Sequence, residues 1–85
     1  MRKITMFTMR SCPYCKQALR WMDELLEENA AYRAIEIEKI DELLYPKIAR
    51  KHNYYYVPAF YVGEEKQHEG VASREIIRRV LDSAL

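Results

Sequence analysis

The hydrophobic pattern of this chain changes abruptly at Cys12-Pro13. Lys3 to Met9 (KITMFTM) is rich in apolar and β-branched residues, which predicts a buried strand. From Pro13 to Asn29 the apolar side chains recur at helical spacing instead. Proline is favoured at the first helical position, where no N–H is needed, so the helix is expected to begin directly after Cys12. A strand that leads straight into a helix is the first half of a parallel, right-handed β-α-β unit.

Two further segments continue this unit. Tyr32 to Glu38 alternates apolar and acidic side chains, which predicts the second strand. Asp41 to His52 has helical periodicity, but Pro46 lies inside it. Because proline removes a hydrogen bond and clashes with the preceding turn, either the helix begins near Tyr45 or it is kinked at Pro46.

The C-terminal part of the chain predicts a hairpin and a last helix. Ala59 to Val62 is a short strand, Gly63-Glu64-Glu65 is a turn, and Lys66 to His68 returns antiparallel as an edge strand. Ser73 is suited to cap the final helix, whose apolar stripe extends from Ile76 to Ala84. The resulting order, β-α-β-α-β-β-α, corresponds to an α/β fold: a four-stranded mixed sheet flanked by three helices, in one domain over residues 1–85.

Length, charge and cysteine content exclude several classes of function. The 85 residues carry 14 basic and 13 acidic side chains, a net charge of +1, so no cationic surface is expected to attract nucleic acid. No apolar run approaches the ~18 residues of a membrane span. The N-terminus has no apolar signal-peptide segment, so we expect a cytoplasmic protein. Two cysteines cannot form a disulfide framework of the secreted type and supply only half of a tetrahedral zinc site, so no metal is expected.

The two cysteines lie where a helix N-terminus favours ionised sulfur. Cys12 is expected beside the unpaired N–H groups at the positive end of the helix dipole, an environment that favours thiolate over thiol. Cys15 lies one turn further on, on the apolar stripe, and should be more buried and less ionised. This asymmetry suits thiol–disulfide exchange, in which an exposed Cys12 thiolate attacks a substrate disulfide and Cys15 resolves the mixed disulfide.

A second feature of the sequence is Val57-Pro58, directly before the third strand. Proline is tolerated at the start of a strand, where its missing donor need not join the ladder. With the cysteine pair present, we expect this X–Pro bond to be cis and the Val57 backbone to lie beside the cysteines. An extended peptide could then pair with the N–H and C=O groups of Val57.

Taken together, these features resemble a glutaredoxin over essentially the whole chain: a strand, C-P-Y-C, a helix, a later V-P before a hairpin, a glycine and a capped last helix. C-P-Y-C, with Pro13 and Tyr14 between the cysteines, is the common dithiol glutaredoxin motif. The resemblance implies a thioredoxin-like fold and a disulfide oxidoreductase that acts on protein disulfides or glutathione mixed disulfides. Glutathione would be its reductant, through a Cys12–Cys15 disulfide, with no tightly bound cofactor. We expect it to act as a monomer that binds neither nucleic acid nor membranes.

The resemblance also implies a glutathione groove beside the nucleophile. Tyr14 would flank the glutathione, and Val57, next to Pro58, would pair with its cysteinyl backbone. Its γ-glutamyl end would face the segment that contains Gly70, Ala72 and Ser73.

This chain departs from the family pattern at three positions of that groove. Met9 stands where a cation is common, and Arg10 follows one place later. Tyr56 replaces the usual threonine before V-P, and Ser73 stands where an acidic residue would pair with the α-ammonium of the ligand. Glu69 or Glu75 is expected to substitute for the missing acidic residue and pair with the ligand ammonium.

Two alternative functions remain open from the sequence. One is a glutaredoxin-like redoxin that is reduced by thioredoxin reductase and serves ribonucleotide reductase or a similar enzyme. The other is a metal-binding, iron–sulfur or redox-sensing module. Of the remaining aromatic residues, Tyr54 and Tyr55 are expected to pack against the fold, and His52 to lie at a helix C-terminus.

Overall fold

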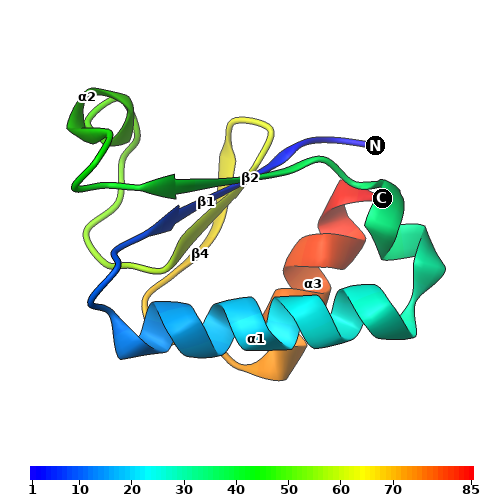
Figure 1. The fold of residues 1–85 in the computed structure, drawn as a ribbon. Coiled ribbons are helices and arrows are strands. Elements are labelled where there is room, and N and C mark those ends of the chain that lie inside the picture. The colour runs from blue at the N-terminus through cyan, green and yellow to red at the C-terminus, as the bar shows by residue number, and fades with distance from the viewer.

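The computed structural model describes residues 1–85 and contains one mixed sheet, three α-helices and one 3₁₀ helix (Figure 1). The elements follow one another as β1 (Ile4–Thr8), α1 (Pro13–Glu28), η1 (Ala30–Ala34), β2 (Ile37–Asp41), α2 (Pro46–Ala49), β3 (Ala59–Val62), β4 (Glu65–Glu69) and α3 (Arg74–Ala84). The strand order is β2-β1-β3-β4, in which β1 and β2 are parallel and the other two pairs are antiparallel. The predicted fold class is confirmed.

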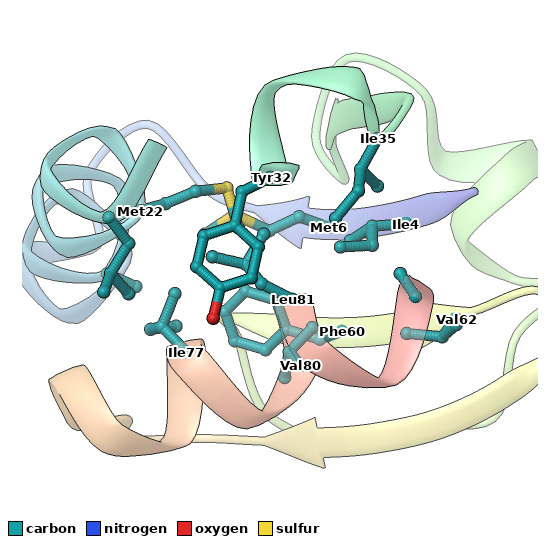
Figure 2. Close-up of a cluster of buried hydrophobic side chains, with 13 residues drawn as sticks. Ile4, Met6, Met22, Tyr32, Ile35, Phe60, Val62, Ile77, Val80 and Leu81 are labelled. Atoms are coloured by element: carbon teal, nitrogen blue, oxygen red, sulfur yellow. The ribbon is translucent and has the colours of Figure 1, made fainter. Parts of the chain in front are cut away.

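One face of the sheet is covered by α1 and α3, which lie side by side below it in Figure 1. Because side chains alternate along a strand, Met6 of β1 and its cross-strand partner Phe60 of β3 both point toward these helices. They belong to a cluster of 13 buried residues, hereafter the helix-side core, which Tyr32 and Ile35 also join (Figure 2).

The opposite face of the sheet has a much smaller cluster, hereafter the aromatic cluster. Its four buried residues are Phe7, Ile40, Ala59 and Tyr61. Partly buried Ala49, Tyr54 and Val57 pack against them. Of the three α-helices, only the short α2 lies on this side of the sheet (Figure 1).

The predicted second strand is displaced, because Tyr32 to Ala34 belong to η1 and not to a strand. Asn29 ends α1, and its side-chain oxygen accepts a hydrogen bond from the Ala31 N–H at 3.0 Å, which starts the 3₁₀ turn. Tyr32 is 4% exposed, and its hydroxyl donates to the Asp82 carboxylate of α3. This contact with a distant helix outweighs the alternating pattern, and the strand begins only at Ile37.

The second helix is also shorter than predicted. Asp41 belongs to β2, and its carboxylate accepts a hydrogen bond from the Leu43 N–H at 2.8 Å, so the chain turns there. The helix begins with Pro46 in its first turn, which was one of the two alternatives for this proline. It ends at Ala49, and His52 lies beyond it, with its ring Nδ1 3.0 Å from the Ile48 carbonyl oxygen.

The two ends of the chain lie close together, since the Arg2 N–H donates to the Ala84 carbonyl at 2.9 Å. Ser73 caps α3 as predicted, accepting a hydrogen bond from the Ile76 N–H at 3.1 Å. None of the helices has the length and apolar content needed to cross a bilayer.

Candidate active site

Cys12 is the N-cap residue of α1, and its sulfur caps the helix. Its backbone is extended, with φ −88° and ψ 110°, and Pro13 occupies the first helical position. The Cys12 N–H donates to the Met9 carbonyl at 2.9 Å, and Sγ accepts a hydrogen bond from the Cys15 N–H at 3.2 Å. The Cys12 sulfur therefore lies at the positive end of α1, at the helix N-terminus where the sequence places it.

Cys15 is held as a neutral thiol. Its side chain is 1% exposed on the buried stripe of α1. Burial raises the pKa of the Cys15 thiol well above its usual range, and the hydrogen bond with Cys12 adds to this effect. Both cysteines are buried, and Cys15 is the more deeply buried of the two, as predicted. Both are free thiols in this structure.

Cys12 is less accessible than predicted. An exposed nucleophile was expected, but the residue is only 6% exposed. The reason is the loop that precedes β3, because Cys12 Sγ lies 3.9 Å from the Val57 carbonyl oxygen.

The Val57-Pro58 bond is cis, as the sequence led us to expect. Pro58 is buried, and its carbonyl accepts a hydrogen bond from the Gly70 N–H at 2.9 Å, which ties the loop to the end of β4. The Val57 N–H donates to no protein acceptor, and its carbonyl accepts a hydrogen bond from the Cys12 thiol at 3.9 Å. The structure thus leaves an unpaired backbone N–H in the residue that contacts Cys12.

Glu69 anchors the same loop. One carboxylate oxygen, Oε2, accepts hydrogen bonds from the Tyr55 N–H at 2.7 Å and the Tyr56 N–H at 3.0 Å. The other, Oε1, accepts from Lys66 Nζ at 2.6 Å. Lys66 and these N–H groups lower the pKa of the Glu69 carboxyl to about 2. Neither acidic residue considered for the ligand ammonium is free, since Glu75 pairs with Arg78.

The sequence did not reveal that Glu69 anchors the loop, because its hydrogen bonds are made to Tyr55 and Tyr56, which are distant from it in the chain. The signal that could have found it is the register of the hairpin, in which Glu69 pairs with Ala59. That register places the end of β4 level with the residues that precede β3. Tyr55 was expected to pack but is 83% exposed, because its backbone rather than its ring is held.

A groove of about 510 Å³ borders the cysteine motif. It lies between the first turns of α1 and the β4–α3 connection, and none of its lining residues is charged. The lining residues are Pro13, Tyr14, Gln17, Trp21, Val71 and Ala72. A second hollow, of about 430 Å³, is lined by Tyr61 of the aromatic cluster, and neither cysteine lines either cavity.

The structure brings most of the candidate groove residues to this end of the sheet. Tyr14 is 56% exposed and lines the groove with Ala72. Gly70 has φ +88° and lies beside Tyr56, since an added Cβ would be in ordinary contact with the Tyr56 Cβ at 3.7 Å. The Ser73 hydroxyl is occupied as the α3 cap.

Arg10 is an exposed residue of the β1–α1 loop. Its backbone N–H donates to Asp41 Oδ2 at 3.1 Å, which links this loop to the end of β2. Its side chain forms no ion pair with any residue of the chain.

A cysteine pair at the start of a helix, beside the loop that precedes β3 of a four-stranded mixed sheet, defines a dithiol redox protein of the thioredoxin fold. The family profile described as "Thioredoxin domain" matches residues 2–82, almost the whole chain. The chain belongs to this thioredoxin domain family. A search of curated proteins finds no match.

Proposed function

We propose that this chain is a glutathione-dependent thiol–disulfide oxidoreductase of the glutaredoxin type, acting on protein disulfides or glutathione mixed disulfides. The observation that carries the proposal is the position of the Cys12 sulfur. Cys12 Sγ accepts a hydrogen bond from the Cys15 N–H at 3.2 Å and donates one to the Val57 carbonyl at 3.9 Å. The sulfur that would attack the disulfide thus lies at the N-terminus of α1, next to the backbone of Val57, whose N–H is free.

The proposed reaction proceeds in two exchanges. The Cys12 thiolate attacks one sulfur of the substrate disulfide, so a Cys12–substrate bond forms while the substrate S–S bond breaks. The departing sulfur leaves as a thiolate and takes a proton from solvent. Cys15 then loses its proton to solvent and attacks the Cys12 sulfur, which releases the second substrate thiol. The substrate gains two electrons and two protons, and the protein keeps a Cys12–Cys15 disulfide.

Glutathione would complete the cycle by reducing this disulfide. Two glutathione molecules supply two electrons and two protons and leave as oxidised glutathione. On a glutathione mixed disulfide, Cys12 alone takes up the glutathionyl group, and a second glutathione removes it. We assign the cysteinyl backbone of glutathione to Val57 and its flanks to Tyr14 and Tyr56. Its γ-glutamyl end would lie along Gly70 to Ser73, and one of its carboxylates beside Arg10.

A second candidate is reduction by thioredoxin reductase. Two observations favour it: the groove beside Cys12 has no charged lining residue, and Glu69 is occupied by the loop and by Lys66. A charge-assisted hydrogen bond contributes about 1.5–3 kcal/mol. Its absence would weaken glutathione binding roughly ten- to hundredfold. A reductase that docks on the protein surface does not need this contact.

A comparison of electron donors separates the two candidates. The oxidised protein would be supplied either with glutathione, glutathione reductase and NADPH, or with thioredoxin reductase and NADPH, and NADPH consumption would be followed. We expect turnover with glutathione. Turnover with thioredoxin reductase alone would replace the first candidate by the second. No turnover with either donor would contradict both.

The cysteine roles predict different effects for two matched variants. Cys12→Ser removes the attacking sulfur and should abolish activity. Cys15→Ser should lose the reduction of protein disulfides by the dithiol route but keep the reduction of glutathione mixed disulfides, which needs only Cys12. The rates of both variants would be measured on both substrates. An equal loss of both activities in the two variants would show that the roles are wrongly assigned or that only a dithiol route operates.

A further inference from the structure

Three consecutive backbone N–H groups precede Pro58, and the structure treats them differently. Those of Tyr55 and Tyr56 donate to Glu69 Oε2 at 2.7 and 3.0 Å, whereas that of Val57 has no protein acceptor. We infer that Glu69 is a positioning residue: by holding the first two N–H groups, it fixes the third, and the Val57 carbonyl, for pairing with the peptide backbone of a disulfide substrate. The inference rests on the proposed exchange at Cys12 but not on the identity of the electron donor.

The side chains of Tyr55 and Tyr56 provide little alternative anchoring for these two residues. The rings of Tyr55 and Tyr56 are 83% and 68% exposed, so their packing restrains the backbone only weakly. Val57 is half-buried and packs at the margin of the aromatic cluster. The Glu69 carboxylate is therefore what holds the backbone of Tyr55 and Tyr56, the two residues between Tyr54 and Val57, which both pack on the aromatic cluster.

Glu69 is itself held at a fixed place. It is the last residue of β4, where it pairs in register with Ala59, directly after Pro58. Lys66 holds its second oxygen at 2.6 Å, so the carboxylate cannot rotate away without breaking an ion pair. The next residue, Gly70, donates its N–H to the Pro58 carbonyl at 2.9 Å. The loop is therefore tied to the end of β4 on both sides of Val57.

This arrangement predicts the substrate class that depends on Glu69. A disulfide whose sulfur belongs to a cysteine within an extended peptide can pair with Val57 while Cys12 attacks. A disulfide without peptide groups can contact only the Cys12 sulfur. Loss of the Glu69 restraint should thus slow the reaction of peptide disulfides and leave the rate for disulfides without peptide groups unchanged. A general loss of stability or of sulfur reactivity would slow both reactions.

Two uncharged probes make this distinction. One is the disulfide of N-acetylcysteine N-methylamide, which has a peptide group on each side of the cysteine; the other is bis(2-hydroxyethyl) disulfide, which has none. Reduced, desalted protein would be mixed with an excess of each probe. The second-order rate constant would be taken from the loss of free thiol after acid quenching. The measured quantity is the ratio of the two rate constants, peptide probe over hydroxyethyl probe.

Glu69→Leu removes the acceptor and should lower this ratio about five- to tenfold, the effect of one or two weakened hydrogen bonds. Glu69→Gln keeps a carbonyl oxygen for the two N–H groups and should retain the ratio within about twofold. Glu65→Gln is the matched control on the same strand, because Glu65 pairs only with Arg2. It should leave the ratio unchanged. If circular dichroism shows that Glu69→Leu does not fold, Glu69→Thr, whose side chain is too short to reach the loop, takes its place.

Three results would overturn the assignment of Glu69: an unchanged ratio in Glu69→Leu, an equal fall of both rate constants, or a Glu69→Gln variant that behaves like Glu69→Leu. A different result would overturn the proposed function itself, and the inference with it. That result is an unmodified protein that attacks neither probe faster than free dithiothreitol does.

Discussion

The helix-side core supports the two cysteines of the candidate site, whereas the aromatic cluster on the opposite face of the sheet supports Val57. The helix-side core has 13 buried residues, and α1, which carries both the Cys12 cap and Cys15, packs on it. The aromatic cluster has four, and Val57 packs at its margin. Cys12 and Val57 are supported from opposite faces of the sheet, yet the Cys12 Sγ and the Val57 carbonyl oxygen lie only 3.9 Å apart.

This difference suggests a division of roles between stability and substrate positioning. A domain of this size is stabilised by only about 5–15 kcal/mol, and most of the apolar burial lies on the helix side. Damage to the helix-side core should therefore unfold the whole domain, the sulfurs included. Damage on the aromatic side should have a smaller effect on stability and reach the site mainly through the Val57 loop.

The largest expected effect is that of Phe60→Ala in the helix-side core. Phe60 is fully buried and lies opposite Met6 in the register of β1 and β3. Removal of the ring should reduce the free energy of unfolding by about 3–5 kcal/mol. Urea titration followed by circular dichroism would measure it, with Tyr61→Ala on the other face of the same strand as the matched comparison, because both substitutions remove an aromatic ring. A loss in Tyr61→Ala as large as that in Phe60→Ala would contradict the division between the faces.

A smaller effect is expected for Tyr54→Phe in the aromatic cluster. The ring stacks on Phe7 with a centroid distance of 4.9 Å, and the hydroxyl donates to Glu42 Oε1 at 2.8 Å. The variant keeps the ring and loses the hydrogen bond, so the free energy of unfolding at pH 7 should fall by about 1 kcal/mol. An unchanged value at pH 7 would show that this hydrogen bond does not support the aromatic side.

Tyr54→Phe should also change how the free energy of unfolding falls at alkaline pH. Burial, followed by the hydrogen bond to Glu42, raises the pKa of Tyr54 above its ordinary value of 10.0. A raised pKa means that the neutral form is favoured in the folded state. This contribution is complete below pH 10.0 and is lost as pH rises toward the folded pKa. As the pH rises above 10.0, the free energy of unfolding should therefore fall less in Tyr54→Phe than in the unmodified protein.

The elements that sequence periodicity located correctly are those whose determinants are local. Pro13 and the apolar stripe define α1, Ser73 caps α3, and the short apolar run from Ala59 to Val62 forms β3. The second strand could not be placed in this way, because Tyr32 is drawn into the helix-side core by its contact with Asp82. No pattern within η1 contains that information.

The features of the candidate site also divide into those that depend on neighbouring residues, which the sequence predicts, and those that depend on distant segments, which it does not. The spacing of Cys12 and Cys15 and the position of Val57-Pro58 were readable from the sequence, because each depends on its immediate neighbours. The engagement of Glu69 was not, since it requires the hairpin register and a loop 13 and 14 residues earlier in the chain. The exposure of Cys12 was overestimated for a related reason: the loop that covers it comes from a distant segment.

The smallest expected effect concerns Glu69, which joins the Val57 loop to β4. The hydrogen bond from Lys66 is the main cause that lowers the pKa of the Glu69 carboxyl from 4.5 to about 2, and the N–H groups of Tyr55 and Tyr56 add to this effect. A lowered pKa means that the carboxylate stabilises the folded state above pH 4.5 and that this contribution is lost as pH falls through about 2. Glu69→Gln should therefore flatten the acid limb of the stability curve in this window. Urea titrations at several pH values would measure it, with Glu65→Gln as control. An acid limb that is flattened equally by both substitutions would show that Glu69 is an ordinary surface carboxylate and does not restrain the loop.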